Sequence, residues 1–87
     1  MSTCDKILAK ARRSAANLRF DEAHALALCL GFEHARTRGS HRIYKHAGSR
    51  TILNLQPDKR DPSKAKKRQV EQLVRLEGDL GFAEEGS

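Results

Sequence analysis

The chain has few of the residues from which large protein cores are built. Its 87 residues include no tryptophan, one tyrosine and three phenylalanines. A chain of this length has room for one domain and buries a modest share of its surface. We therefore expect a thin core of Leu, Ile, Val and Ala, no deep substrate cavity, and a function that lies on the surface or in a shallow groove.

The sequence also lacks long apolar runs. No stretch approaches the roughly 18 apolar residues needed to cross a bilayer, and no apolar segment of signal-peptide length follows Met1. The two cysteines, Cys4 and Cys29, lie at unrelated positions, and Cys29 is expected to fill the core side of its helix. These features predict a cytoplasmic protein with no membrane partner and with both thiols reduced.

Motifs for binding metals and for reading DNA are missing as well. The four histidines and the two cysteines lack the short spacings of structural zinc sites. No helix-turn-helix pair with a basic recognition helix is present. We therefore predict no metal, no small-molecule cofactor and no direct role as a DNA-binding repressor.

Positive charge is what the sequence has in excess. The formal net charge is +6, and residues 1–75 hold all 17 lysines and arginines against 7 of the 11 acids, a net charge of +10. The remaining four acids lie in residues 76–87, which carry no base. A basic surface attracts polyanions, because neutralised phosphates release their counterions. The charge favours a nucleic acid or an acidic protein as partner, and a merely solvated surface is the alternative.

Periodicity predicts two helices followed by a meander of three strands. Gly31 suits the left-handed cap of the second helix, the turn at Gly39-Ser40 joins the first two strands, and Pro57 ends the third. The expected elements are helices over about residues 5–16 and 21–30 and strands over 32–38, 41–46 and 50–56.

A last helix is expected from about residue 62. Asp61 is a good N-cap acceptor, Pro62 suits the first helical position, and Gly78 is expected to end the helix. Beyond it the chain should fray, although Leu80 and Phe82 could dock back on the core. The element order predicts an α+β fold, in which helices cover one face of an antiparallel three-stranded sheet and the other face is open to water.

The most unusual segment runs from Arg36 to His46 around the turn formed by Gly39. Strand alternation puts His41, Ile43 and Lys45 on one face and the residues between them on the other. Histidine beside cations suits phosphodiester cleavage, because imidazole exchanges a proton near neutral pH while cations hold the phosphate. From residue types alone, a solvated polar strand remains the commoner explanation. The candidate RNA-binding residues of this segment are Arg36, Arg38, Ser40, Arg42 and Lys45.

A second basic run straddles the expected start of the last helix. It could form a rim that contacts the RNA backbone, or it could be the solvated first turn of that helix. Basic side chains are slightly unfavourable at the positive end of a helix, which favours binding. The candidate residues are Lys64, Lys66, Lys67 and Arg68.

The motif order resembles the HicA toxins of bacterial type II toxin–antitoxin systems. Leu30-Gly31-Phe32 is followed by Arg36, by Gly39-Ser40-His41 and by Ile43-Tyr44-Lys45-His46, and residues 53–57 and 64–66 also resemble one branch of the family. The resemblance covers about residues 17–75. The chain departs from it in a longer helix before Asn17 and in the loop 58–61, where many members carry a glycine.

The resemblance implies a fold like the double-stranded-RNA-binding domain and one HicA-like domain over residues 1–87. Residues 1–16 would be a helical extension, 17–77 the core and 78–87 a frayed acidic tail. It also implies a ribosome-independent endoribonuclease that cleaves mRNA, is neutralised by a HicB-type antitoxin and uses His41 as its catalytic histidine. Arg38, Ser40 and Lys45 would position the phosphate, and the second proton-transfer group stays open. The rival interpretation is a non-catalytic RNA-binding module, or an inactive relative of the toxins that acts only through a protein partner.

Overall fold

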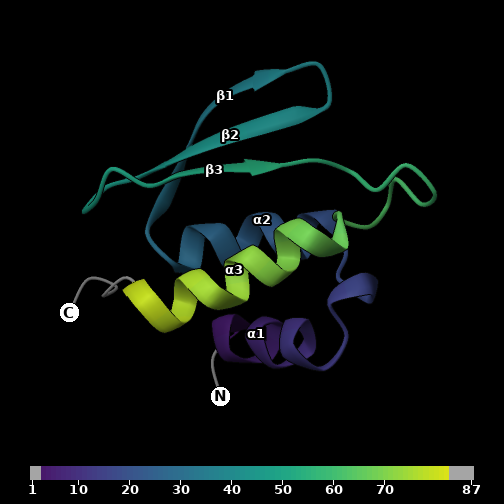
Figure 1. The fold of residues 1–87 in the computed structure, drawn as a ribbon, viewed down its shortest axis with the longest axis horizontal. Helices are drawn as coiled ribbons and strands as arrows, with labels where there is room; N and C mark the ends of the chain where they lie inside the picture. Colours follow the sequence, from purple (N-terminus) through teal and green to yellow (C-terminus); the bar gives the residue numbers. More distant parts are fainter. Residues whose placement is uncertain (1–2, 83–87) are drawn as a thin grey trace.

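The chain forms an α+β fold in which helices cover one face of a three-stranded sheet (Figure 1). This is a computed structural model, and it describes residues 3–82. The predicted fold class and the order α-α-β-β-β-α are confirmed. Within residues 3–82, no helix is both long and apolar enough to cross a membrane. The elements are α1 (Thr3–Arg13), the 3₁₀ helix η1 (Ala15–Asn17), α2 (Phe20–Cys29), β1 (Phe32–Arg38), β2 (His41–His46), β3 (Ile52–Leu55) and α3 (Lys67–Leu80).

The sheet is an antiparallel meander in the order β1-β2-β3. Arg38 pairs with His41 across the turn, and Gly39 has a φ of +59°, a conformation that glycine adopts without the clash of a Cβ. A bulge lies between His34 and Arg36 on β1. The predicted turn at Gly39-Ser40 is therefore confirmed.

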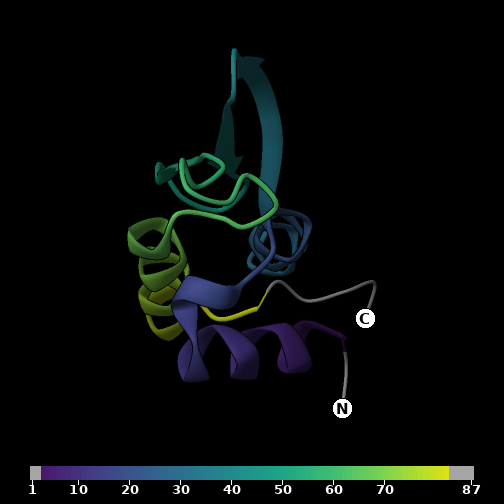
Figure 2. The same cartoon turned by 90° about the vertical axis from the view of Figure 1, so that its right-hand side faces the viewer.

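Each face of the sheet has its own set of side chains. Tyr44, Leu53 and Leu55 have no exposed surface and face the helices, whereas Ile43, Lys45, Ile52 and Asn54 line hollows on the other face. The free end of the β1–β2 hairpin rises away from the helices (Figures 1 and 2), and every residue of β1 after Phe32 is exposed. The strand alternation predicted for residues 41–46 is thus confirmed.

Beneath α2 and α3, on the side away from the sheet, α1 forms a further layer (Figures 1 and 2). Its apolar face buries Ile7, Leu8 and Ala11. Its polar side makes two ion pairs, from Lys10 to Glu22 at 2.7 Å and from Arg12 to Glu77 at 2.9 Å.

The two cysteines form a disulfide, so the prediction of two reduced thiols is wrong for this structure. Cys4 and Cys29 are joined with their Cα atoms 6.0 Å apart. Cys4 lies in the first turn of α1 and Cys29 is the last residue of α2. The two helices run in opposite directions across a short connection, and this brings the start of one beside the end of the other. Spacing along the sequence does not show that proximity.

The prediction of a helix from Pro62 is also wrong. Asp61 Oδ1 accepts hydrogen bonds from the Ser63 hydroxyl (2.6 Å) and backbone N–H (3.2 Å), which makes a turn instead of a helix cap. Ala65 then donates its N–H to the Leu18 carbonyl (3.0 Å) and is almost fully buried. These pairings with a distant segment keep the chain extended, and α3 therefore begins only at Lys67.

The C-terminal end of α3 also differs from the prediction. The helix runs through Gly78 and ends at Leu80, and Gly81 follows with a φ of +70° and donates its N–H to the Glu77 carbonyl. The helix therefore ends before Gly81, whose positive φ favours glycine, and not at Gly78 as predicted. Leu80 and Phe82 are partly buried against the core, as the sequence suggested they could be. The rest of the predicted tail, residues 83–87, lies outside the described residues.

Candidate functional site

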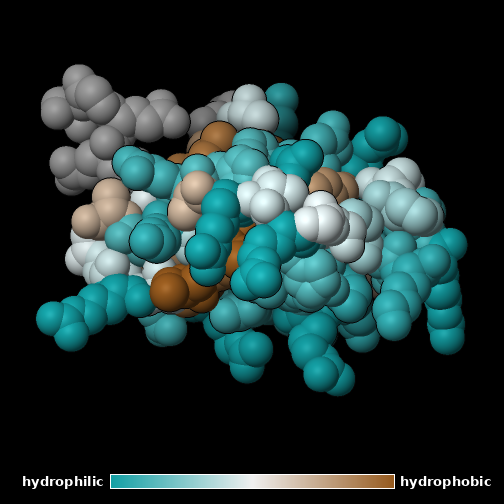
Figure 3. All heavy atoms as spheres, turned by 90° about the horizontal axis from the view of Figure 1, so that it is seen from above, coloured by the Kyte–Doolittle hydropathy of each residue, from teal (hydrophilic) through white to brown (hydrophobic). Residues whose placement is uncertain are grey.

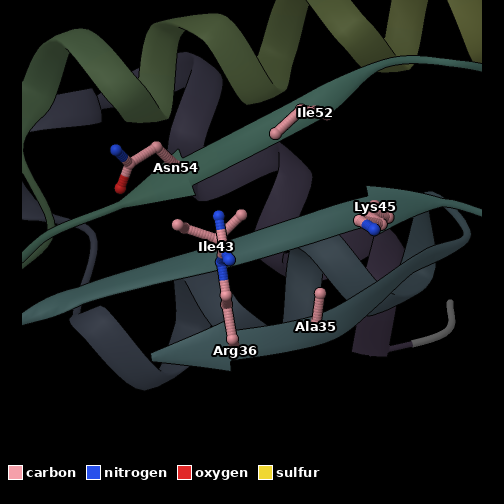
Figure 4. A pocket seen from close by; sticks show the side chains of 6 residues that line it. All are labelled: Ala35, Arg36, Ile43, Lys45, Ile52 and Asn54. Carbon is pink, nitrogen blue, oxygen red and sulfur yellow. The ribbon is translucent and has the colours of Figure 1, made fainter. Parts of the chain in front are cut away.

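Two shallow hollows adjoin on the open face of the sheet. Each has a volume of about 340 Å³, and Ile43 and Asn54 line both. Figure 3, seen from the side on which the sheet lies, shows mostly hydrophilic side chains around a small hydrophobic area. The first hollow is lined by Arg38, His41, Ile43 and Asn54, and the second by Ala35, Arg36, Ile43, Lys45, Ile52 and Asn54 (Figure 4).

His41 is placed by the turn that precedes it. It is the first residue of β2, it is half-buried, and its neighbour across the strand pair is Arg38. Among residues 3–82, no group forms a hydrogen bond or ion pair with its imidazole, so both ring nitrogens can meet a ligand. Ser40 is exposed beside it in the turn. The open face thus presents an uncommitted histidine.

The cations around His41 are also uncommitted. Arg36, Arg38 and Lys45 are exposed, and none of the salt bridges of the described chain includes them. Strand alternation places one acidic residue of the hairpin, Glu33, on this open face. Glu33 is paired with Lys45, at the end of the hairpin that is far from His41. Unpaired cations on an exposed surface attract phosphates.

Arg42 does not belong to this group. Its guanidinium lies 4.9 Å from the centre of the Phe20 ring on the helix-facing side of the sheet. The structure therefore separates Arg42 from His41 and from the other predicted RNA-binding residues of the hairpin, because neighbours along a strand point to opposite faces.

The predicted basic run lies elsewhere. Lys64 is half-buried and contacts Asn17 Oδ1 at 3.1 Å, and Lys66 is the N-cap residue of α3. Lys67 and Arg68 are exposed in the first turn of α3. These residues follow the loop that leaves β3 at the end of the sheet where β2 begins (Figure 1), but none of them lines either hollow.

The other histidines have structural partners. His46 Nε2 lies 2.7 Å from the Leu30 carbonyl oxygen, and its Nδ1 accepts the Gly48 N–H at 3.0 Å. Nε2 therefore donates to the carbonyl, and both nitrogens are engaged. His34 Nε2 lies 2.8 Å from Thr37 Oγ1. Neither histidine shares a face with His41, so neither can serve as its proton-transfer partner.

His24 packs against Tyr44 beneath the sheet. The Tyr44 hydroxyl lies 2.6 Å from His24 Nδ1, and the neutral imidazole accepts that hydrogen bond. Burial lowers the pKa of His24, and the nearby charges of Arg42 and His34 lower it further. Burial also raises the pKa of Tyr44, which keeps its hydroxyl protonated as the donor.

The stability of the protein is therefore expected to fall as the pH drops below about 6.5, the ordinary pKa of histidine. Unfolded chains take up a proton on His24 in that range, while the folded chain resists it until a lower pH, so protonation favours unfolding. Urea unfolding between pH 5 and 7.5 measures the slope. His24→Gln should flatten it; equal slopes in His24→Gln and the wild type would contradict this assignment.

Asn54 is the site residue that the sequence reasoning missed. Its neighbours Leu53 and Leu55 are fully buried, so Asn54 points to the open face. Strand alternation could have placed Asn54 on the face opposite Leu53 and Leu55, but its position next to Ile43 depends on the register between β2 and β3. Among residues 3–82, no group of three His, Cys, Asp or Glu side chains is arranged to hold a metal ion.

Comparison with known proteins adds no relative. No family model, no curated protein and no solved structure matches the chain. The resemblance to HicA toxins therefore rests on the motif residues themselves, and the chemistry of the site rests on its geometry.

Proposed function

We propose that this chain is a metal-independent endoribonuclease that cleaves mRNA, and that it acts as the toxin of a HicA-type toxin–antitoxin system. One observation carries the proposal: His41 lies uncommitted in a shallow hollow with the unpaired guanidinium of Arg38 beside it. A proton-transfer group and a phosphate-binding cation are the minimum that cleavage of RNA requires. The element order from α2 onward, α-β-β-β-α, is also the order that the resemblance implies.

The reaction uses the ribose of the substrate as the nucleophile. The 2′-oxygen attacks the adjacent phosphorus, the bond to the 5′-oxygen breaks, and the products carry a 2′,3′-cyclic phosphate and a 5′-hydroxyl. His41 accepts the proton of the 2′-hydroxyl or donates one to the 5′-oxygen. Arg38 offsets the charge on the phosphoryl oxygens, and Ser40 and Lys45 hold the phosphates on either side of it. Water carries the second proton, since no other histidine of the described chain shares this face.

The proposed partners follow from the same surface. A basic open face suits the RNA backbone, and a HicB-type antitoxin would block cleavage by covering that face. An enzyme that cleaves mRNA acts in the cytoplasm, where disulfides are rare. The proposal therefore requires that the site remains functional when Cys4 and Cys29 are reduced.

The products of RNA cleavage test the proposal. Purified protein should cut a labelled single-stranded RNA in the presence of EDTA and leave 2′,3′-cyclic phosphate and 5′-hydroxyl ends, which mass spectrometry identifies. The same strand with 2′-deoxyribose throughout should bind but remain intact, because it lacks the nucleophile. RNA that binds without being cut would overturn the proposal in favour of the non-catalytic RNA-binding module.

A further inference from the structure

The second hollow on the open face has no role in the proton transfer at His41, yet it adjoins that site. It shares Ile43 and Asn54 with the His41 hollow, and its rim carries Arg36 and Lys45 (Figure 4). Its volume of about 340 Å³ is enough for a flat group of the size of a nucleobase. An RNA strand with a phosphate at His41 can therefore lay a neighbouring nucleotide over this hollow.

The floor of the hollow is apolar although the surrounding face is charged. Ile52 is 60% exposed, and with Leu28 it is one of two large hydrophobic side chains exposed in residues 3–82. Ile43 lies beside it on the neighbouring strand and is half-buried. No Phe, Tyr or Trp side chain lies on this face of the described sheet, so a base packed in this hollow would rest on these aliphatic side chains. Covering Ile52 with a base removes apolar surface from water, which favours binding.

Asn54 supplies hydrogen-bonding groups at the boundary of the two hollows. Its side chain offers a carbonyl acceptor and an amide donor, and no other described residue forms a hydrogen bond with it. An uncommitted amide beside an apolar floor can read the edge of a stacked base. Asparagine forms two hydrogen bonds with an amino group next to a ring nitrogen. Adenine presents this pair on two of its edges and cytosine on one, which favours adenine.

We propose that this hollow binds the nucleobase next to the cleaved phosphodiester, with the base on Ile43 and Ile52 and its edge read by Asn54. Arg36 and Lys45 hold the phosphate of that nucleotide. The inference rests on the proposed function, because the nucleotide is defined by its position beside the bond that His41 cleaves. It makes the enzyme selective for adenine at one position, and it assigns that selectivity to Asn54.

Cleavage of an RNA library with random sequence tests the subsite. Sequencing of the new ends should show adenine enriched at one position beside the cleaved bond for the wild type. In Asn54→Ala the enrichment, counted among the cuts that the folded variant still makes, should fall by about tenfold. Gln72→Ala, which removes an amide from α3 on the other side of the sheet from the hollow, is the control and should keep the wild-type profile. An unchanged profile in Asn54→Ala overturns the subsite and leaves the nuclease proposal intact.

A binding selection keeps the two proposals separable. If the wild type cuts no RNA, the nuclease proposal fails, but the same library can be selected for binding to wild-type protein and to Asn54→Ala. Bound sequences that share an adenine only with the wild type support a base-reading subsite on a binding module. Selections without any base preference in either protein overturn the subsite, and they point to a protein partner for this apolar floor.

Discussion

Replacing His41 with glutamine is expected to slow RNA cleavage by about two to four orders of magnitude, the range that general acid–base catalysis contributes. Glutamine has a similar size and can still form a hydrogen bond, but it cannot take up or release a proton near neutral pH. RNA affinity should stay within a few-fold, because Arg36, Arg38 and Lys45 still contact the backbone. Single-turnover cleavage of a labelled RNA gives the rate, and fluorescence anisotropy gives the affinity.

His34→Gln is the matched control for this experiment. His34 is exposed, belongs to the same hairpin and contacts Thr37 on the face opposite His41. It therefore tests the loss of a histidine near the site without loss of the proposed proton carrier. Wild-type cleavage by His41→Gln, or an equal loss in His34→Gln, would contradict the assignment of the catalytic role to His41.

The sheet was the part of the fold most open to prediction from sequence. Strand alternation has a period of two wherever a strand forms, so it separated His41, Ile43 and Lys45 from Arg42 and Tyr44 without knowledge of the tertiary structure. The turn at Gly39 was equally local, because its backbone conformation favours glycine. These two features alone place His41 at the start of a strand on the open face.

The start of α3 could not be predicted in this way. Asp61 and Pro62 form a valid helix-start signal, but the same Asp61 side chain also suits a turn. The choice depends on the pairing of Ala65 with Leu18, which lies 47 residues earlier in the numbering. Local sequence signals carry no information on a contact of that kind. The predicted RNA-binding rim, which comprises Lys64, Lys66, Lys67 and Arg68, lies apart from the His41 hollow.

The second hollow and the disulfide were missed for a related reason. The hollow requires the register between β2 and β3, in which Ile43 is paired with Asn54. The disulfide requires the antiparallel arrangement of α1 and α2. Both are relations between elements, whereas periodicity and motif spacing describe one element at a time.

Loss of the Cys4–Cys29 disulfide is expected to lower the free energy of unfolding by about 3 kcal/mol. The disulfide joins residues 25 apart in sequence. It closes a loop in the unfolded chain, and because this loop restricts the conformations that the chain gains on unfolding, the disulfide stabilises the folded state. Small domains are stable by about 5–15 kcal/mol, so the change is a large fraction of the total. Urea unfolding of the oxidised protein, of the protein reduced with dithiothreitol and of Cys4→Ser/Cys29→Ser measures it. The reduced protein and the double variant should have the same free energy of unfolding, and dithiothreitol should not affect the double variant. The same urea midpoint for all three samples would contradict a stabilising role for the disulfide.

The reduced protein should nevertheless cleave RNA, provided that it is still folded. The disulfide joins α1 to α2, and α1 lies on the side of the helices that faces away from the sheet (Figure 2). None of the residues that line the two hollows belongs to α1. The cleavage rate per folded molecule should therefore be the same in oxidised and reduced samples below the melting temperature of the reduced protein. A folded, reduced sample that no longer cuts RNA would contradict this independence, and it would exclude a role for the nuclease in a reducing compartment.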